Sequence, residues 1–290
     1  MLDADTTSAA YWKKCGDDAL AHGVKGLVVM VGYFLLSDDF HSNTLLNSHQ
    51  GAHWDCAGDN KIKVATNPTG AKQPSAFVRP ESYLDWKANP DLATAERCVS
   101  MLREAGFNAS EDPNFVWIHD VYLILIRMFP DSSKCPPTTI ISMNAGYDPW
   151  FHTKMGEALR PLRHEGYLFI GTGGAVHNLY RNRWSDMLLH RESLGQEVPP
   201  EMWALDFRQA TEDVITKNSG PRLRAALIRL MRHPRYRDAH GTEEHWIPAL
   251  FCAGAAGTYE DVGSVNVLGA ETWELSNMCN SQYTLGCYNT

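Results

Sequence analysis

The glycine-rich segment at residues 171–177, GTGGAVH, is the feature that most constrains how this chain can fold. It directly follows an apolar run from Tyr167 to Ile170, which predicts a buried strand. The glycines allow the backbone to turn sharply as it leaves that strand. Ligand sites in α/β sheets lie at the carboxyl ends of the strands. We therefore expect His177 to stand at a functional site.

Apolar runs and helical spacings alternate along the chain, which predicts an α/β fold. Continuous apolar runs predict buried strands at residues 25–32 and 167–170, and a further strand is expected at residues 138–144, after two prolines. Helical spacing predicts helices at residues 8–22, 92–104, 152–163, 199–217 and 221–232. We expect a single domain over residues 1–290, with a central, mostly parallel sheet flanked by helices. Residues 33–50 are interpreted as an insertion and residues 64–90 as a loop that covers a pocket.

Charge and cysteine usage exclude several classes of protein. The formal net charge of -8 argues against nucleic acid as a partner, because nucleic-acid binders usually carry a basic stripe. The seven cysteines are odd in number, irregularly spaced and without a C-x-x-C pair, which predicts free thiols in a reducing compartment. The acidic N-terminus has no signal-peptide core, and the apolar run at residues 121–129 is too short to span a bilayer. We expect a cytoplasmic protein without a membrane partner, and the oligomeric state stays open.

Two further histidines have distinctive neighbours in the sequence. His53 lies within an Ala-His-Trp segment, and His245 follows two glutamates and precedes Pro248. Neutral imidazole is the commonest metal ligand among side chains. The wide sequence separation of His53, His177 and His245 excludes a local zinc knuckle, and three ligands with open positions describe a catalytic metal. Iron(II) oxygenases use two histidines and a carboxylate in a similarly open arrangement.

Each of these features also has a structural interpretation. A single histidine in a chain with twelve commonly lies on the surface or in the core. Glu243 and Glu244 are expected to be exposed carboxylates at the start of a helix rather than ligands. Five arginines flank the helix expected at residues 221–232, and we interpret them as a solvated helix face. These arginines are Arg222, Arg224, Arg229, Arg232 and Arg235.

Several motifs in the same order resemble the class III extradiol ring-cleavage dioxygenases (the family of the protocatechuate 4,5-dioxygenase beta subunit). The likeness is greater for the DOPA-extradiol-dioxygenase-like branch of that family, and it runs from about residue 24 to 257, apart from residues 33–50. The matching segments are AHWD at 52–55, GEALRPLR at 156–163, GTGGAVHNL at 171–179, TEEHWIP at 242–248 and AGAAG at 253–257.

The resemblance implies an iron(II) enzyme that opens the ring of a catechol with O2 beside, rather than between, the two hydroxyls. Zinc(II) is implied as an alternative occupant. His53 and His245 match metal ligands. His177 matches an acid–base catalyst at the metal, or an additional ligand when zinc is bound. His119 falls where the family has a histidine that faces the substrate, although Asp120 replaces the glycine that normally follows it.

The resemblance ends at the front of the chain. Family members begin with a strand and an HGSP-type segment that supplies the first metal histidine, and this sequence shows no such segment. His41 and His49 are the candidates to replace it. Two hypotheses therefore stay open: an extradiol dioxygenase, or a catalytically impaired metal-binding pseudoenzyme that lacks this ligand. A zinc-dependent hydrolase is less favoured, because no hydrolase-type motif accompanies the histidines.

Overall fold

The computed structural model of the protein describes residues 5–31, 60–75, 78–194 and 198–286. The insertion expected at residues 33–50 lies outside the described residues, and so do His41, His49 and His53. Within the described ranges, helices and strands alternate along most of the chain, as the sequence predicts.

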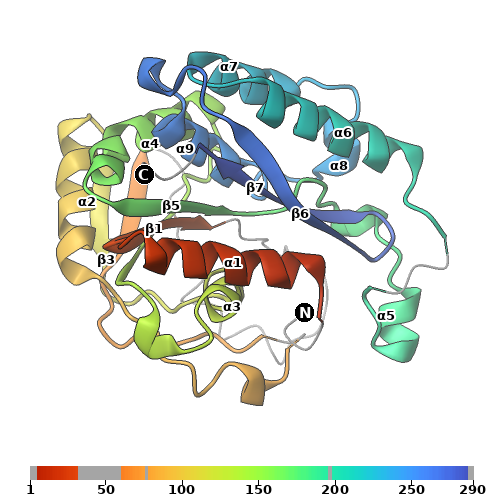
Figure 1. Ribbon diagram of the computed structural model, residues 1–290, viewed down its shortest axis with the longest axis horizontal. Helices are drawn as coiled ribbons and strands as arrows, with labels where there is room; N and C mark the ends of the chain where they lie inside the picture. Colours follow the sequence, from red (N-terminus) through yellow and green to blue (C-terminus); the bar gives the residue numbers. More distant parts are fainter. Residues whose placement is uncertain (1–4, 32–59, 76–77, 195–197, 287–290) are drawn as a thin grey trace.

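A five-stranded sheet lies at the centre of the molecule, in the order β3-β2-β4-β1-β5 (Figure 1). The strands are β1 (Gly26–Val31), β2 (Lys61–Ala65), β3 (Asn108–Asp112), β4 (Thr138–Ile141) and β5 (Tyr167–Thr172). Strand β1 pairs in parallel with both β4 and β5, and β2 pairs in parallel with β3. The β2–β4 pair is antiparallel. The sheet is therefore mostly parallel, which confirms the predicted fold class.

Helices cover both faces of this sheet, and β1 shows how. Leu27 and Val29 pack into one core cluster with side chains of α1 and α3, whereas Val28 and Met30 pack into a second with side chains of α2, α4 and α9. Figure 1 shows α1 and α3 on one side of the sheet and α4 and α9 on the other. This alternation is the period-two pattern of a strand that is buried on both faces. These helices are α1 (Thr7–Ala21), α2 (Leu92–Glu104), α3 (His119–Met128), α4 (Pro149–His164) and α9 (Ile247–Ala256).

Local capping sets the bounds of the predicted helices. The side chains of Asp91 and Asp148 accept hydrogen bonds from backbone N–H groups in the first turns of α2 and α4. Gly23 and Gly106 follow the ends of α1 and α2 with φ of 66° and 90°, a conformation that glycine adopts without strain. Both glycines therefore end their helices.

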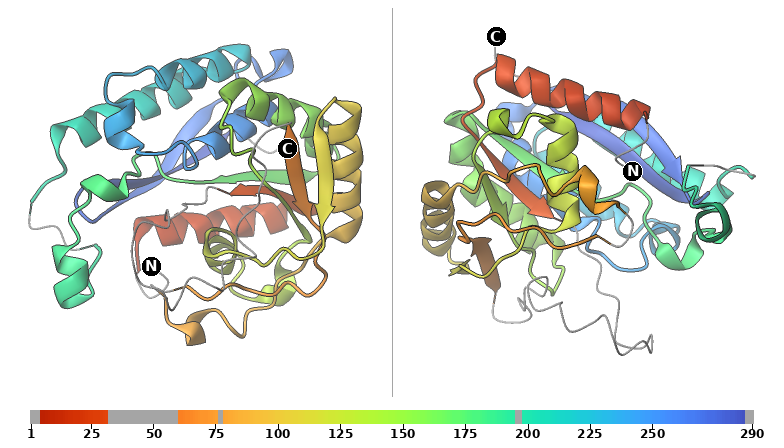
Figure 2. Two further views of the ribbon diagram at one scale, coloured as in Figure 1. Left: turned by 180° about the vertical axis from the view of Figure 1, so that it is seen from behind. Right: turned by 90° about the horizontal axis from the view of Figure 1, so that it is seen from below.

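A second layer of structure completes the molecule after β5. It comprises α5 (Ser185–His190), α6 (Met202–Lys217), α7 (Pro221–Leu230), α8 (Tyr236–Ala239) and an antiparallel hairpin of β6 (Asn266–Glu274) and β7 (Met278–Leu285). The hairpin packs between α1 and α6. Seen from below in Figure 2, α1 lies along the hairpin. Through this hairpin, the last residues that the structure describes pack against the first helix, α1.

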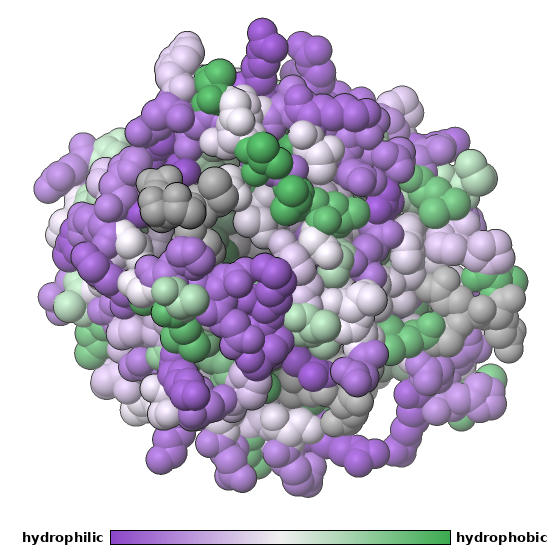
Figure 3. All heavy atoms as spheres, in the orientation of Figure 1, coloured by the Kyte–Doolittle hydropathy of each residue, from purple (hydrophilic) through white to green (hydrophobic). Residues whose placement is uncertain are grey.

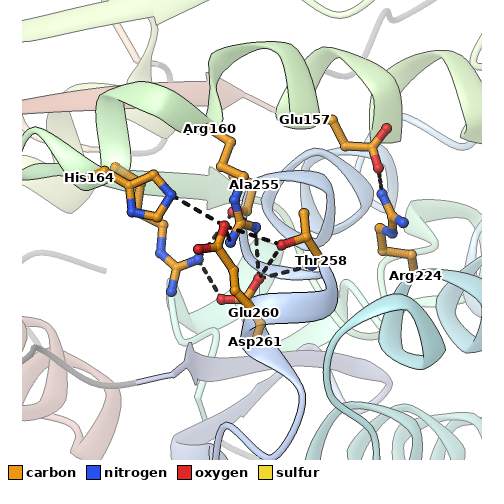
Figure 4. Close-up of polar contacts among 9 residues, drawn as sticks. Glu157, Arg160, His164, Arg224, Ala255, Thr258, Glu260 and Asp261 are labelled. Atoms are coloured by element: carbon orange, nitrogen blue, oxygen red, sulfur yellow. Dashed lines mark hydrogen bonds and ion pairs between the residues drawn. The ribbon is translucent and has the colours of Figure 1, made fainter.

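Close packing of α4 against α9 explains two of the sequence motifs. A Cβ on Gly156 would lie 2.0 Å from the carbonyl oxygen of Phe251, and a Cβ on Gly254 would lie 2.0 Å from that of Thr153. Arg160 and Arg163 extend from α4 to the carboxylate of Asp261, which follows α9 (Figure 4). The GEALRPLR and AGAAG segments therefore build a helix–helix contact.

The predicted loop at residues 64–90 is partly wrong, because β2 ends at Ala65 within it and a short 3-10 turn occupies Pro80–Ser82. The rest of its described residues lack regular helix or strand apart from isolated bridges at Lys72 and Pro90. The apolar run at residues 121–129 forms most of α3, which packs against α1 rather than a bilayer.

The described cysteines agree with the expectation of free thiols. Cys15, Cys98, Cys135, Cys252 and Cys279 are all unbonded. Among the described residues, no helix combines the length and the apolar character that crossing a bilayer would require.

Candidate functional site

His177 lies just beyond the carboxyl end of β5, as the sequence predicts, but its glycines serve another purpose. Gly171, Gly173 and Gly174 do not adopt a positive φ, so glycine is not required at these positions for its backbone freedom. Instead, a Cβ on Gly173 would lie 2.2 Å from the carbonyl oxygen of His245, and one on Gly171 would lie 2.5 Å from that of Pro248. The glycines therefore bring the end of β5 against the start of α9.

This close approach places the rings of His177 and His245 face to face. Their centroids lie 3.6 Å apart with an interplanar angle of 22°. The backbone fixes His177, because its N–H donates to the carbonyl of Ala239 at 2.9 Å. Its neighbour Val176 exchanges backbone hydrogen bonds with Cys279 of β7. Two histidines that lie far apart in sequence thus meet at the end of one strand.

The protein provides His245 with an unusual environment. Its Nε2 is buried and has no hydrogen-bond partner within the described part of the chain. Desolvation, together with the neighbouring His177, His240 and His119, holds the pKa of His245 well below its usual value. Desolvation also lowers the pKa of His177. Both imidazoles are therefore neutral near pH 7, which is the form that binds metals and accepts protons.

His119 occupies the first position of α3, and its pKa is shifted in the opposite direction to those of His177 and His245. Its Nε2 lies 3.0 Å from Oδ1 of Asp120. Desolvation disfavours the charged ring, but the charge of Asp120 and the hydrogen bond to it outweigh this effect and raise the pKa of His119. Asp120 and His119 also act on the pKa of His177, which links α3 electrostatically to the histidine pair.

His240 is a buried neighbour that sequence reasoning missed. It pairs with the backbone of His177 in an isolated bridge, and its Nε2 donates to the carbonyl of Ala175 at 3.1 Å. Desolvation, with a contribution from His177, lowers the pKa of His240 to about 3. The ring packs in an aromatic cluster with Phe207, Tyr236 and Trp246. His240 therefore supports the site from the core side, and no motif in the sequence singles it out.

The two glutamates before His245 differ from each other. Glu243 forms an ion pair with Arg237 at 2.6 Å. Glu244 is buried, and the hydroxyl of Thr242 donates to its carboxylate. The expectation of an exposed carboxylate at residue 244 is wrong, because this side chain turns into the protein, where burial raises its pKa.

The predicted set of three metal histidines is represented here by two. Within the described ranges, no group of three or more His, Cys, Asp or Glu side chains is arranged to hold a metal ion. His177 and His245 meet, whereas His53 lies outside the described residues. The unpartnered Nε2 of His245 and the neutral state of both rings nevertheless suit metal donors in their chemistry.

Known proteins resemble this chain in sequence. No protein-family model matches it. The chain is 27% identical over 225 residues to a 4,5-DOPA dioxygenase extradiol of Escherichia coli (strain K12), covering 78% of the chain and 77% of that protein. It is 31% identical over 222 residues to the dioxygenase tasH of Hapsidospora irregularis, covering 73% and 64%. It is 32% identical over 165 residues to a 4,5-DOPA dioxygenase extradiol of Portulaca grandiflora, covering 56% and 55%. The chain thus spans less than two thirds of the last two relatives.

A solved structure shows the same architecture. An uncharacterized protein of Escherichia coli K12 superposes with a TM-score of 0.67 at 22% sequence identity, over 96% of this chain and 92% of that chain. This likeness confirms the fold, with its central mostly parallel sheet and flanking helices.

Proposed function

The chain is a relative of the 4,5-DOPA extradiol dioxygenases, and we propose that it is a non-haem, metal-dependent extradiol dioxygenase. Its reaction opens the ring of a catechol with O2 beside the two hydroxyls, so that both oxygen atoms enter the product. The observation that carries this proposal is the stacked pair of His177 and His245 at the end of β5. Such a strand end is where α/β sheets place their ligands.

We assign the metal to His53 and His245, with iron(II) as the catalytic ion. His177 stands beside it as the acid–base group, and it becomes an additional ligand when zinc(II) is the occupant. The support from the structure is the unpartnered Nε2 of His245 and the neutral imidazole of His177. His53 stays a prediction from sequence. When bound, such a metal acts as a Lewis acid that lowers the pKa of a coordinated phenol.

The protein's own groups supply the proton chemistry. His177 is neutral because desolvation lowers its pKa, so its ring can accept a proton from a substrate hydroxyl and later return it. His119 is biased toward its protonated form by Asp120, so it can donate a hydrogen bond to an anionic substrate oxygen. His177 therefore accepts protons, whereas His119 stabilises negative charge on the substrate.

The pseudoenzyme remains the rival hypothesis. Its support comes from the sequence, which shows no HGSP-type segment to supply the first metal histidine that the resemblance implies. Metal content and turnover separate the two hypotheses, because a pseudoenzyme that lacks a ligand binds iron weakly and consumes no O2.

The test is to load the protein anaerobically with iron(II), measure bound metal by mass spectrometry, and follow O2 uptake with DOPA, caffeate and protocatechuate. We expect about one iron per chain and O2 uptake with at least one catechol. His177→Ala should reduce turnover by about 10²–10⁴-fold, the usual contribution of a general acid–base group.

His190→Ala is the matched control, because this exposed histidine lies on α5 and should retain full turnover. Absence of iron and of O2 uptake with every catechol contradicts the enzyme and favours the pseudoenzyme. Full turnover in His177→Ala contradicts the role assigned to His177.

A further inference from the structure

The basic segment at residues 221–237 is not a uniformly solvated helix face. It carries six arginines and no acidic residue, in a chain whose net charge is -8. Three of the arginines are neutralised in the structure, and the partners come from elements outside the segment. These pairs are Arg224 with Glu157, Arg235 with Asp206 and Asp238, and Arg237 with Glu243.

The other three arginines, Arg222, Arg229 and Arg232, have no ion pair with any part of the chain that the structure describes. All three are exposed. They line one groove, between the end of α6 and α7, together with His233 and Asn218. The three arginines of the basic segment that lack an ion pair therefore lie together in this groove.

The shape of the groove follows from the helical spacing of its lining residues. Arg222 and Arg229 lie two turns apart on one face of α7, so their backbones are separated by about 10 Å. The positions between them on this face are Ala225 and Ala226, whose small side chains leave the space open. The cavity volume is about 500 Å³, which falls within the range of small-molecule sites.

We propose that this groove binds a small organic anion that carries a chain of phosphate groups. Guanidinium groups bind phosphate oxygens in pairs, and no carboxylate lines the groove to oppose them. A chain of phosphates spans arginines that are two helical turns apart, so each guanidinium can bind its own phosphate group without bending toward the other. The alanines, Val214 and Leu230 provide an apolar floor for the uncharged part of the ligand.

The groove is separate from the histidine pair. Its nearest link to that site is His233, whose ring packs edge-to-face on Phe207 at 5.7 Å, and Phe207 in turn packs on His240. In the space-filling view, hydrophilic residues predominate along the upper edge, where Figure 1 places α7 (Figure 3). The proposal therefore stands whether or not the chain is a dioxygenase.

The test is calorimetric titration of the metal-free, full-length protein with inorganic tripolyphosphate, near 0.15 M salt so that weak surface attraction is screened. We expect saturable binding of one tripolyphosphate per chain. Arg222→Gln and Arg229→Gln should each raise Kd about tenfold, as expected for the loss of a charge-assisted contact. Orthophosphate should bind more weakly and should not respond to Arg222→Gln.

Arg79→Gln is the matched control, because it removes the same charge from an exposed arginine outside the groove, and it should leave Kd unchanged. Thermal unfolding of each variant should match the wild type, since the substituted arginines have no ion pair with the described residues. The proposal is overturned if tripolyphosphate shows no saturation at millimolar concentration, or if Arg79→Gln weakens binding as much as Arg229→Gln. Tighter binding of a DNA duplex than of tripolyphosphate would overturn it in favour of nucleic acid.

Discussion

The charged cluster between α4 and Asp261 and the histidine pair at the end of β5 are both polar groups enclosed by the fold, yet they are satisfied differently. In the cluster, Nη1 of Arg160 and Nη1 of Arg163 each lie 2.7 Å from an oxygen of the Asp261 carboxylate (Figure 4). Arg160 also donates to the carbonyl of Ala255 at 3.1 Å. In the pair, Nε2 of His245 has no hydrogen-bond partner among the residues that the structure describes.

This difference separates a structural role from a functional one. Buried polar groups are nearly always hydrogen-bonded, and each exception calls for an explanation. The cluster is complete, so its charges hold α4 to the end of α9. In the histidine pair, Nε2 of His245 is not hydrogen-bonded to any described residue, so this atom can bind a ligand.

Removing the arginine at the centre of the cluster should have the largest effect on folding. Arg160→Met leaves the buried Asp261 carboxylate with Arg163 as its remaining arginine partner. Breaking a buried ion pair from one side costs about 3–5 kcal/mol of unfolding free energy. Urea denaturation measures this loss.

Glu260→Gln is the control, because this carboxylate is largely exposed although it also contacts Arg160. It should leave the unfolding free energy close to that of the wild type. An Arg160→Met protein as stable as Glu260→Gln would show that the cluster does not hold the two elements together.

The two regions should lose stability in different ranges of pH. Burial lowers the pKa of His240, which packs behind the histidine pair, to about 3, and it lowers the pKa of His152, which belongs to neither region, to about 4. The unfolded chain therefore takes up protons below a histidine pKa of about 6.5 while the folded chain does not. Each histidine then costs up to about 1.4 kcal/mol per pH unit as the pH falls from 6.5 toward 4.

Asp261 affects the unfolding free energy at a lower pH than these histidines do. Desolvation raises its pKa, but hydrogen bonds from Arg160, Thr258 and Arg163 outweigh this and lower it. Its stabilisation is therefore complete above the unfolded pKa of about 3.9 and is lost as the pH falls below it. Unfolding free energies from pH 7 to 3 should show that Asp261→Asn flattens the curve below pH 4. An effect of Asp261→Asn on the slope between pH 6.5 and 4 would contradict this separation.

Removing the unsatisfied imidazole should change stability much less than breaking the cluster. His245→Leu deletes a buried nitrogen that has no partner, which offsets the lost stacking on His177. We expect the unfolding free energy of the metal-free protein to stay within about 1 kcal/mol of the wild type. Binding of iron(II) should be lost in the same variant. A destabilisation as large as that of Arg160→Met would mean that His245 is a structural residue.

The same contrast explains what the sequence could and could not predict. Strands β1, β4 and β5 are continuous apolar runs, so their burial was evident. Strand β3 reads Asn-Ala-Ser-Glu-Asp and owes its existence to pairing with β2 rather than to its own composition. The β6–β7 hairpin was missed because its turn places Leu275 and Ser276 at φ of 51° and 64°, where glycine or asparagine is the usual signal.

The candidate site was predicted in part for a related reason. The position of His177 follows from a strand and its glycines, which are local features. The stacking on His245 depends on how closely β5 approaches α9, and the burial of His240 depends on three aromatic neighbours from other elements. Neither can be read from spacing along the chain.

The smallest predicted effect concerns the charge that Asp120 places beside His119. Asp120→Asn keeps a hydrogen-bond acceptor at Oδ1 but removes the negative charge that raises the pKa of His119. We expect the pKa of His119 to fall, since desolvation then acts without that opposing charge. The pKa of His177 should fall as well, because Asp120 also raises it. Titration of the ring protons by nuclear magnetic resonance in the metal-free protein measures both shifts, and Asp17→Asn on the exposed side of α1 is the control. A His119 pKa that is unchanged in Asp120→Asn would contradict the pairing, and a shifted His119 with an unchanged His177 would separate α3 from the histidine pair.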